Sequence, residues 1–230
     1  MSSPSMVSTR TGARGEFVAE GVWLEVWAEL GRHVAPRPGL FLDRDGVVVE
    51  EVHYLHRATN VRLQSGGAAL IRDARAAGIP VAVVTNQSGI GRGLYGWDDF
   101  HAVEAEIRSR LAAEGASLDA VAACPFHPEF TPGWLAAHAH WRKPGPGMVL
   151  LLGERLGIDL ARSWLVGDKA SDAAAARAAG LAGAVHVLTG HGARFRAEAE
   201  ALAGTGFEVV VAADIAATHC VLDRLTGALL

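Results

Sequence analysis

Short apolar runs alternate with amphipathic segments from residue 40 to the C-terminus. The apolar runs, typical of buried strands, lie at 40–42, 79–84, 118–123, 163–166, 184–188 and 208–211. Helical periodicity is found at 66–77, 97–114, 146–156, 193–203 and 213–226, and in an alanine-rich segment that Ser171 could cap and that ends at Gly180. Residues 124–144 are rich in Pro and His and are expected to form a loop. This alternation predicts an α/β fold, a central parallel sheet with helices on both faces.

The segment before this pattern has a different character. Residues 17–31 carry apolar side chains with partly helical spacing: Val18, Val22, Trp23, Val26, Trp27 and Leu30. We interpret the segment as an extra element on the domain surface, with a dimer contact as the alternative. Met1–Thr11 is rich in Ser and Thr without the layout of a signal peptide, which predicts a disordered leader and a cytoplasmic protein. We therefore expect a partly disordered N-terminal extension over 1–36 and one domain over 37–230.

Composition narrows the classes of partner. Of the 230 residues, 50% are hydrophobic and 20% charged, and the formal net charge is −4, which does not support a nucleic-acid partner. No uninterrupted apolar run reaches the roughly 18 residues of a membrane span, so we expect no membrane partner. The two cysteines, Cys124 and Cys220, are too few for a disulfide framework. A monomer or a weak homodimer is expected.

Two aspartates follow the first apolar run. Asp43 and Asp45 come directly after Leu42, and Gly46 follows them. Placing two like charges at the end of a buried strand is unfavourable unless a cation or a proton compensates, but the carboxyl edge of an α/β sheet is where ligands bind. Paired carboxylates can share Mg²⁺, and one can attack an electrophile while the other handles the leaving-group proton. The alternative is a turn with solvated aspartates.

Other strands of the predicted sheet also end in polar groups. Thr85 and Asn86 offer a hydroxyl and backbone amides suited to phosphate oxygens, and the glycine-rich loop 89–93 carries Arg92. Lys143 precedes a proline at the start of a helix and could neutralise a transferring phosphoryl group, unless it is simply a solvated lysine. Asp168 would complete a metal site. Asp172 could orient Lys143 or stabilise a helix N-terminus.

Together these clusters fit phosphoryl transfer, in which positioning and charge neutralisation dominate. Their order resembles the haloacid dehalogenase (HAD) superfamily of phosphatases, in particular the branch of D-glycero-D-manno-heptose-1,7-bisphosphate 7-phosphatase and histidinol-phosphatase. The resemblance covers about residues 38–215. It rests on FLDRDG (41–46), VHYL (52–55), TNQSGIGRG (85–93), CPFHP (124–128), RKPGPGM (142–148) and VGDKASDAAAA (166–176).

The resemblance implies a HAD-like, Rossmannoid three-layer α/β/α sandwich without a large cap domain, and a Mg²⁺ cofactor. Asp43 would be the nucleophile and Asp45 the general acid and base. The side chains of Asp43 and Asp168, with the backbone carbonyl of Asp45, would bind Mg²⁺. By the same resemblance, Lys143 would neutralise charge, and Thr85, Asn86, Arg142 and Lys169 would contact the substrate. Arg92, the cation of the glycine-rich loop, is a further candidate for substrate binding.

The chain departs from the family pattern at a loop that often holds structural zinc. Cys124 is retained, but Phe126, Ala139 and Trp141 stand where the other ligands are expected, so zinc at that ligand set is not supported. Cys124, His127, His138 and His140 could form a shifted site. The alternative is a zinc-free loop held by Trp134 and Trp141.

Three hypotheses about function follow. The first is a Mg²⁺-dependent phosphatase acting on a small phosphorylated sugar, the heptose bisphosphate that the resemblance implies, with Arg57, Arg92 and Arg142 suited to a second phosphate. The second is a histidinol-phosphate phosphatase, whose cationic leaving group would suit Glu50 and Glu51. The third is a noncatalytic scaffold that keeps the fold, against which the intact set of Asp43, Asp45, Lys143 and Asp168 argues.

Overall fold

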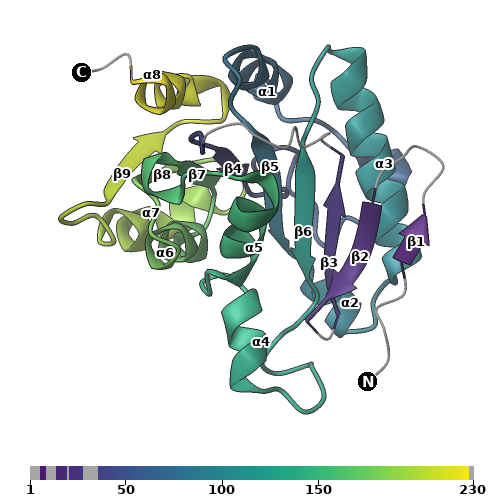
Figure 1. Ribbon diagram of the computed structural model, residues 1–230. Helices are drawn as coiled ribbons and strands as arrows, with labels where there is room; N and C mark the ends of the chain where they lie inside the picture. The colour runs from purple at the N-terminus through teal and green to yellow at the C-terminus, as the bar shows by residue number, and fades with distance from the viewer. Residues whose placement is uncertain (1–5, 9–13, 20, 28–35, 228–230) are drawn as a thin grey trace.

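A nine-stranded sheet forms the centre of the protein (Figure 1). The computed structural model describes residues 6–8, 14–19, 21–27 and 36–227. The strands are β1 (Met6–Ser8), β2 (Arg14–Val18), β3 (Val22–Val26), β4 (Leu40–Leu42), β5 (Val81–Asn86), β6 (Ala120–Cys124), β7 (Trp164–Gly167), β8 (Gly183–Val187) and β9 (Glu208–Ala212). Their order is β1-β2-β3-β6-β5-β4-β7-β8-β9. From β6 to β9 all neighbours are parallel, and β1–β3 extend the β6 edge in antiparallel fashion.

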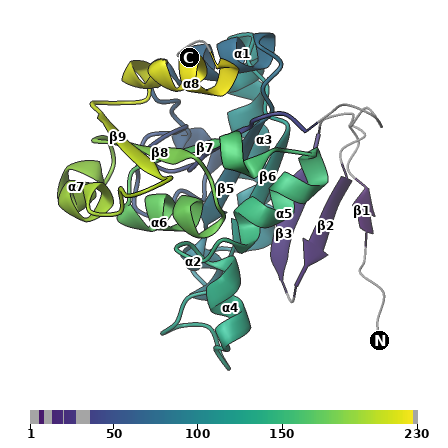
Figure 2. The same ribbon diagram turned by 60° about the vertical axis from the view of Figure 1, so that its left-hand side comes forward.

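Helices cover both faces of the sheet (Figure 2). One face is covered by α1 (Gly67–Ala76), α3 (Trp97–Ala113) and α8 (Cys220–Thr226), and the other by α5 (Gly147–Leu156) and α6 (Ala170–Ala178), beside which α7 (Gly192–Glu200) packs. The shorter elements are α2 (Ser88–Gly91), α4 (Ala136–Trp141), η1 (Ala58–Asn60), η2 (Leu160–Arg162) and η3 (Ala216–Thr218). The predicted three-layer α/β/α sandwich is confirmed. No large cap domain interrupts the described part of the chain.

Burial on both faces explains the continuous apolar runs. In β4, Leu40 and Leu42 pack into the cluster beneath α1 and α3, while Phe41 packs into the cluster beneath α5 and α6. Successive side chains of a strand point to opposite faces, so a strand covered on both sides must be apolar throughout.

The topology brings the polar strand ends together. Strand β4 lies between β5 and β7, with Leu42 opposite Val83 on one side and Val166 on the other, all in parallel register. The chain therefore leaves β4 towards one half of the sheet and later returns to build the other half. At such a switch point the carboxyl ends of adjacent parallel strands line one crevice, where ligands bind in α/β folds.

The helical interpretation of residues 17–31 is wrong, because the described part of this segment is strand. Strands β2 and β3 form a hairpin, and β3 pairs with β6. Val22, Trp23 and Leu24 are all buried, and Phe17 and Trp23 join an edge-on aromatic cluster with Trp97 of α3. An apolar run buried on both faces lacks the alternation that marks a half-exposed strand, so its spacing can partly resemble that of a helix. Leu30 lies outside the described residues.

Part of the predicted leader is also ordered into the sheet. Met6–Ser8 forms β1, which pairs with β2. The rest of the expected disordered stretch, 1–5 and 9–11, lies outside the described residues. The boundary between 36 and 37 stays a prediction.

Two local expectations are corrected. The loop predicted at 124–144 contains the short helix α4. Ser171 does not cap α6, because the helix already begins at Ala170 and the cap position is Lys169, whose backbone N–H donates to Asp172 Oδ2 at 2.9 Å. Within the described residues, no helix has both the length and the apolar character needed to span a membrane.

Candidate active site

A buried lysine bridges two aspartates at the crevice. Lys143 Nζ lies 2.8 Å from Asp43 Oδ1 and 2.6 Å from Asp172 Oδ1, and it also donates to the Val84 carbonyl at 2.8 Å. The contact with Val84 is a hydrogen bond, and the two contacts with the aspartates are ion pairs. Burial lowers the pKa of Lys143, but the negative charges of Asp172 and Asp43 outweigh that effect and hold the pKa above its ordinary value. Lys143 is therefore a fixed cation beside Asp43.

Asp168 stands next to this pair with an unsatisfied oxygen. The side chain is fully buried, Oδ2 accepts a 2.7 Å hydrogen bond from the His191 backbone, and Oδ1 has no partner among the described residues. Burial, and then the charges of Asp43 and Asp172, raise the pKa of Asp168 to about 7. A buried carboxylate oxygen without a partner, beside two other carboxylates, is unfavourable unless a cation is bound.

The three carboxylates form a group suited to a hard cation. Ligand atoms of Asp43, Asp168 and Asp172 all lie within 4.8 Å of one another. An all-oxygen donor set of this kind suits Mg²⁺. The orphaned Asp168 oxygen and this donor set together fit the predicted cofactor.

Two glycines allow the backbone to approach Asp168 closely. Gly46 (φ +83°) and Gly190 (φ +56°) both adopt left-handed conformations. A Cβ on Gly46 would lie 2.6 Å from Asp168 Oδ2, and one on Gly190 would also overlap that oxygen. Glycine is therefore required at both positions, for conformation and for space.

Asp45 is held by a guanidinium and an amide. Arg44 Nε and Nη2 donate to the Asp45 carboxylate at 3.0–3.1 Å, and Gln87 Nε2 donates to its Oδ2 at 3.1 Å. Arg44 is buried, and its Nη1 donates to Glu104 of α3 at 3.1 Å. Burial lowers the pKa of Arg44, but Asp45 and Glu104 more than offset this, so the pKa lies above its usual value.

Thr85 and Asn86, the last two residues of β5, make different contacts. Asn86 exchanges two hydrogen bonds with the Lys143 backbone, donating to its carbonyl at 3.0 Å and accepting from its N–H at 3.1 Å. It thereby fixes the segment that carries Lys143. Thr85 is buried, and its Oγ1 accepts from Gln87 Nε2 at 2.8 Å.

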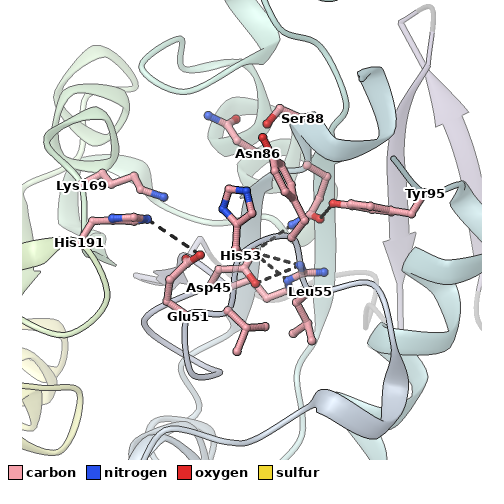
Figure 3. Close-up of a pocket in the computed structure, with 13 residues that line it drawn as sticks. Asp45, Glu51, His53, Leu55, Asn86, Ser88, Tyr95, Lys169 and His191 are labelled. Atoms are coloured by element: carbon pink, nitrogen blue, oxygen red, sulfur yellow. Dashed lines mark hydrogen bonds and ion pairs between the residues drawn. The ribbon is translucent and has the colours of Figure 1, made fainter. Parts of the chain in front are cut away.

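A cavity of about 260 Å³ opens in front of Asp45 (Figure 3). It is lined by Arg44, Asp45, Glu51, Val52, His53, Tyr54, Leu55, Asn86, Gln87, Ser88, Tyr95, Lys169 and His191. Lys169 and His191 face Glu51 across it, with His191 Nε2 3.9 Å from Glu51 Oε1. Burial, and then the charge of Asp45, raise the pKa of Glu51 to about 6. Of the predicted substrate contacts, Asn86 and Lys169 line this cavity.

Arg92 and Arg142 lie outside the cavity wall. The Arg92 guanidinium stacks 3.8 Å from the centre of the Phe130 ring and lies 5.8 Å from the ring of Tyr54, which lines the cavity. Arg142 Nη1 donates to the Phe126 carbonyl at 2.9 Å. Arg57 is exposed and does not line the cavity either.

The histidines of the zinc-loop region do not gather into a ligand group. In the described chain, the aspartate trio is the one cluster with metal-ligand geometry, so Cys124, His127, His138 and His140 do not converge. Burial raises the pKa of Cys124 to about 12, which keeps the thiol protonated. The rings of Phe126 and Trp134 pack around His138, and Trp141 packs against the same core.

Sequence reasoning missed Gln87, Tyr95 and His191. Gln87 lies between the predicted Asn86 and the predicted loop, and its contact with Asp45 joins residues 42 positions apart. Tyr95 and His191 reach the site from loops after β5 and β8, whose paths the pattern of strands does not predict. A polar residue directly after a predicted strand was the available signal for Gln87.

Comparison with known proteins places this geometry in a family. The model of the haloacid dehalogenase-like hydrolases matches residues 22–180, and a HAD-hydrolase-like model matches residues 140–226. The chain belongs to the haloacid dehalogenase-like hydrolase family. This HAD-family membership confirms the resemblance and the expectation of an enzyme, a phosphoric monoester hydrolase, since its curated relatives are phosphatases.

Two curated relatives illustrate the similarity. The D-glycero-beta-D-manno-heptose-1,7-bisphosphate 7-phosphatase of Mesorhizobium japonicum is 43% identical over 179 residues, 76% of this chain and 81% of the relative. The phosphatase of the same name from Rhodopseudomonas palustris is 44% identical over 147 residues, 64% of this chain and 82% of the relative.

Solved HAD structures share the fold. A HAD-like protein of Mesorhizobium loti has a TM-score of 0.77 and 37% identity, covering 92% of this chain and 96% of its own. The D,D-heptose 1,7-bisphosphate phosphatase of B. bronchiseptica, complexed with magnesium and phosphate, has a TM-score of 0.68 and 32% identity, covering 79% and 96%.

Proposed function

We propose that this HAD hydrolase is a Mg²⁺-dependent phosphatase of small sugar phosphates, and that its substrate is D-glycero-D-manno-heptose 1,7-bisphosphate, cleaved at the 7-phosphate through an aspartyl-phosphate intermediate. One observation carries the reaction type: Lys143 Nζ bridges Asp43 and Asp172 beside the orphaned Oδ1 of Asp168. A nucleophilic carboxylate, a fixed cation and an open metal-ligand oxygen are the parts that phosphoryl transfer to an aspartate needs.

Asp43 is the nucleophile in this proposal. Its Oδ1 is held by Lys143 and by the Arg44 backbone N–H at 2.7 Å, and no hydrogen bond from a described residue falls on Oδ2. A carboxylate oxygen of Asp43 forms a bond to phosphorus as the bond between phosphorus and the sugar oxygen breaks. The positive charge of Lys143 stabilises the added negative charge on the phosphoryl oxygens and on Asp43.

Asp45 moves the proton. In its protonated form it gives the proton to the departing sugar oxygen, which leaves as an alcohol. The resulting carboxylate then takes a proton from water, whose oxygen attacks phosphorus and frees both phosphate and Asp43. The Thr85 hydroxyl, which accepts from Gln87 and donates to no described residue, keeps its hydrogen for a phosphoryl oxygen.

The residues that would hold Mg²⁺ are Asp43 and Asp168, with the backbone carbonyl of Asp45. Bound there, the ion supplies charge neutralisation for the phosphoryl group. Asp172 lies in the same carboxylate group but is engaged by Lys143 and by the Lys169 backbone, so its part is to hold Lys143 in place.

The choice of substrate rests on the relatives and on the cavity. The two curated relatives with 43% and 44% identity are heptose-bisphosphate 7-phosphatases. A cavity of about 260 Å³ suits a monosaccharide rather than a polymer, and Lys169, His53 and His191 place basic groups in its wall. Such groups can receive a second phosphate, and Arg92 can assist from beyond Tyr54.

Histidinol phosphate is the second candidate, because Glu51 is in the cavity wall where a cationic leaving group would be recognised. Glu50 does not line the cavity, so of these two glutamates Glu51 alone is placed to contact a cationic leaving group. The scaffold hypothesis would require the complete Asp43, Lys143 and Asp168 arrangement to have no chemical use.

Phosphate release tests the proposal. The purified protein is assayed with heptose bisphosphate, fructose bisphosphate and histidinol phosphate, with Mg²⁺ and then with EDTA. We expect the heptose to be hydrolysed with the highest kcat/KM and EDTA to abolish turnover. Preference for histidinol phosphate would support the second candidate, and inactivity on every ester would support the scaffold. Cytoplasmic location and a monomeric or weakly dimeric state remain part of the proposal.

A further inference from the structure

The side chain of Gln87 forms three hydrogen bonds in a buried position. Nε2 donates to Asp45 Oδ2 at 3.1 Å and to Thr85 Oγ1 at 2.8 Å, and Oε1 accepts from the Tyr95 hydroxyl at 2.6 Å. Gln87 is 2% exposed, and its backbone N–H donates to the Cys124 carbonyl at 2.7 Å. Both the backbone and the amide of this residue are therefore fixed.

The hydroxyl of Tyr95, which Figure 3 labels, donates to Gln87 Oε1 and thereby sets which way the Gln87 amide faces. Burial raises the pKa of Tyr95 to about 12, so the hydroxyl stays protonated and acts as a donor. A donor there selects the Gln87 oxygen and turns the NH₂ group towards Asp45 and Thr85. The Tyr95 ring is seated against Gly89, where a Cβ would overlap it. The loop after α2 is therefore shaped to deliver this hydroxyl.

The contacts on Asp45 are unequal between its two oxygens. Oδ2 accepts from Gln87 Nε2 and from two nitrogens of Arg44, whereas Oδ1 accepts from Arg44 Nη2 alone. A carboxylate oxygen has two lone pairs, so Oδ1, with a single donor, is the oxygen that has room for a further partner such as the leaving oxygen. Holding Oδ2 on Gln87 thus presents Oδ1 as the proton-carrying atom of Asp45.

We propose that Gln87 and Tyr95 are positioning residues for proton transfer, which hold Asp45 so that Oδ1 delivers the proton to the leaving oxygen. Neither residue gains or loses a proton in the reaction. The inference rests on the proposed function, because it assigns roles to residues that support the acid of that mechanism. Arg44, anchored on Glu104 and over the Phe100 ring, provides the fixed second side of the carboxylate.

The test compares esters that differ in their need for an acid. An alkyl phosphate, such as the heptose bisphosphate, needs its leaving oxygen protonated, whereas p-nitrophenyl phosphate releases a stable phenolate. Rates are compared as kcat/KM, which reports steps up to the first irreversible one, so the later use of Asp45 as a base does not enter. The variants are Gln87→Met, which keeps the length of the side chain, and Tyr95→Phe, which removes one oxygen.

We expect Gln87→Met to lower kcat/KM on the alkyl ester about 30-fold and on the aryl ester less than about three-fold, a fraction of what a general acid contributes. Tyr95→Phe should also lower kcat/KM more on the alkyl ester than on the aryl ester, but by a smaller factor than Gln87→Met. Asp45→Asn supplies the reference pattern for loss of the acid. Thr218→Val is the matched control, because it removes a buried hydroxyl, which donates to the Ile215 carbonyl at 2.7 Å, from outside the cavity, and the ratio of the two rates should not change.

Equal losses on both esters would overturn the inference, since they would mean that Gln87 supports phosphate binding or the fold in general. If Gln87→Met does not fold, Tyr95→Phe decides in the same way: a split supports the inference and equal rates overturn it. A wild-type protein inactive on both esters would instead refute the proposed function, and this inference with it. The two failures are therefore distinguishable.

Discussion

The ammonium nitrogen of Lys143 lies closer to Asp172 Oδ1, at 2.6 Å, than to Asp43 Oδ1, at 2.8 Å. Asp172 Oδ2 also accepts a hydrogen bond from the Lys169 backbone N–H, so the same carboxylate stabilises the N-terminus of α6 and orients Lys143. The sequence left open whether Asp172 orients Lys143 or stabilises a helix N-terminus, and its side chain does both. The helix that follows β7 thereby fixes the charge that faces Asp43.

Replacing Asp172 with asparagine should weaken catalysis without removing the helix cap. The amide oxygen can serve either Lys143 or the Lys169 N–H but carries no charge. A hydrogen bond between charged partners is stronger than a neutral one by about 1–2 kcal/mol, so we expect kcat to fall about ten-fold. Steady-state phosphate release measures this. Asp73→Asn, which breaks a half-exposed pair with Arg72, is the matched control and should change kcat less than about two-fold.

Asp43→Asn should abolish turnover. The substitution keeps the shape of the side chain but removes the charge of the nucleophile and half of the Lys143 ion pair. We expect less than about a hundredth of the wild-type rate, a barrier increase of more than about 2.7 kcal/mol. Phosphate release with Mg²⁺ present measures the rate, and circular dichroism confirms that the variant is folded. A folded variant that retained more activity than this would rule out covalent catalysis by Asp43.

The core of the site could be predicted because it follows from strand ends. Asp43, Thr85 and Asp168 each follow or end an apolar run, and the carboxyl ends of parallel strands share one edge. The predicted strand at 40–42 matches β4, and the others match within a few residues. For these residues, position along the chain determines position in space.

Contacts made by loops could not be predicted in this way. Tyr95 reaches Gln87 only because the chain after α2 folds back over Gly89, and His191 faces Glu51 through a turn at Gly190. The N-terminal strands failed for another reason. Trp23 and its neighbours are buried on both faces, and the partner of β3 is β6, almost one hundred positions later. Periodicity carries no information on such pairing.

Glu51→Gln should stabilise the protein at high pH and not at low pH. The pKa of Glu51 in the folded protein is about 6, against an ordinary value of 4.5, because burial disfavours its ionised form. Above pH 6 the folded state carries the cost of that charge, about 2 kcal/mol for a shift of this size. As the pH falls, Glu51 becomes protonated in the folded protein near pH 6 and in the unfolded chain only near pH 4.5. The cost therefore disappears between these two pH values. A neutral glutamine avoids it throughout.

Urea unfolding in EDTA at pH 8 and pH 4.5 measures this difference. We expect the variant to be more stable than the wild type by about 1–2 kcal/mol at pH 8 and equally stable at pH 4.5. Glu50→Gln is the matched control, since that neighbour is exposed and lies outside the cavity. A stabilisation by Glu51→Gln that was the same at both pH values would contradict the ionisation argument.

Gly190→Ala should weaken the response to Mg²⁺ because it displaces Asp168. Gly190 has φ +56°, and a Cβ there would overlap Asp168 Oδ2 and lie 3.0 Å from the Gly46 Cα. Gly157, which ends α5 with φ +63°, has nothing within 4 Å of a Cβ and provides the matched control. Both variants carry the cost of a left-handed alanine, about 1 kcal/mol, but only Gly190→Ala disturbs the carboxylate group.

We therefore expect Gly157→Ala to lower the melting temperature without changing the response to Mg²⁺. Gly190→Ala should also raise the Mg²⁺ concentration for half-maximal phosphate release by about ten-fold or more. Equal Mg²⁺ dependence in the two variants would show that Asp168 is not the residue through which the metal acts.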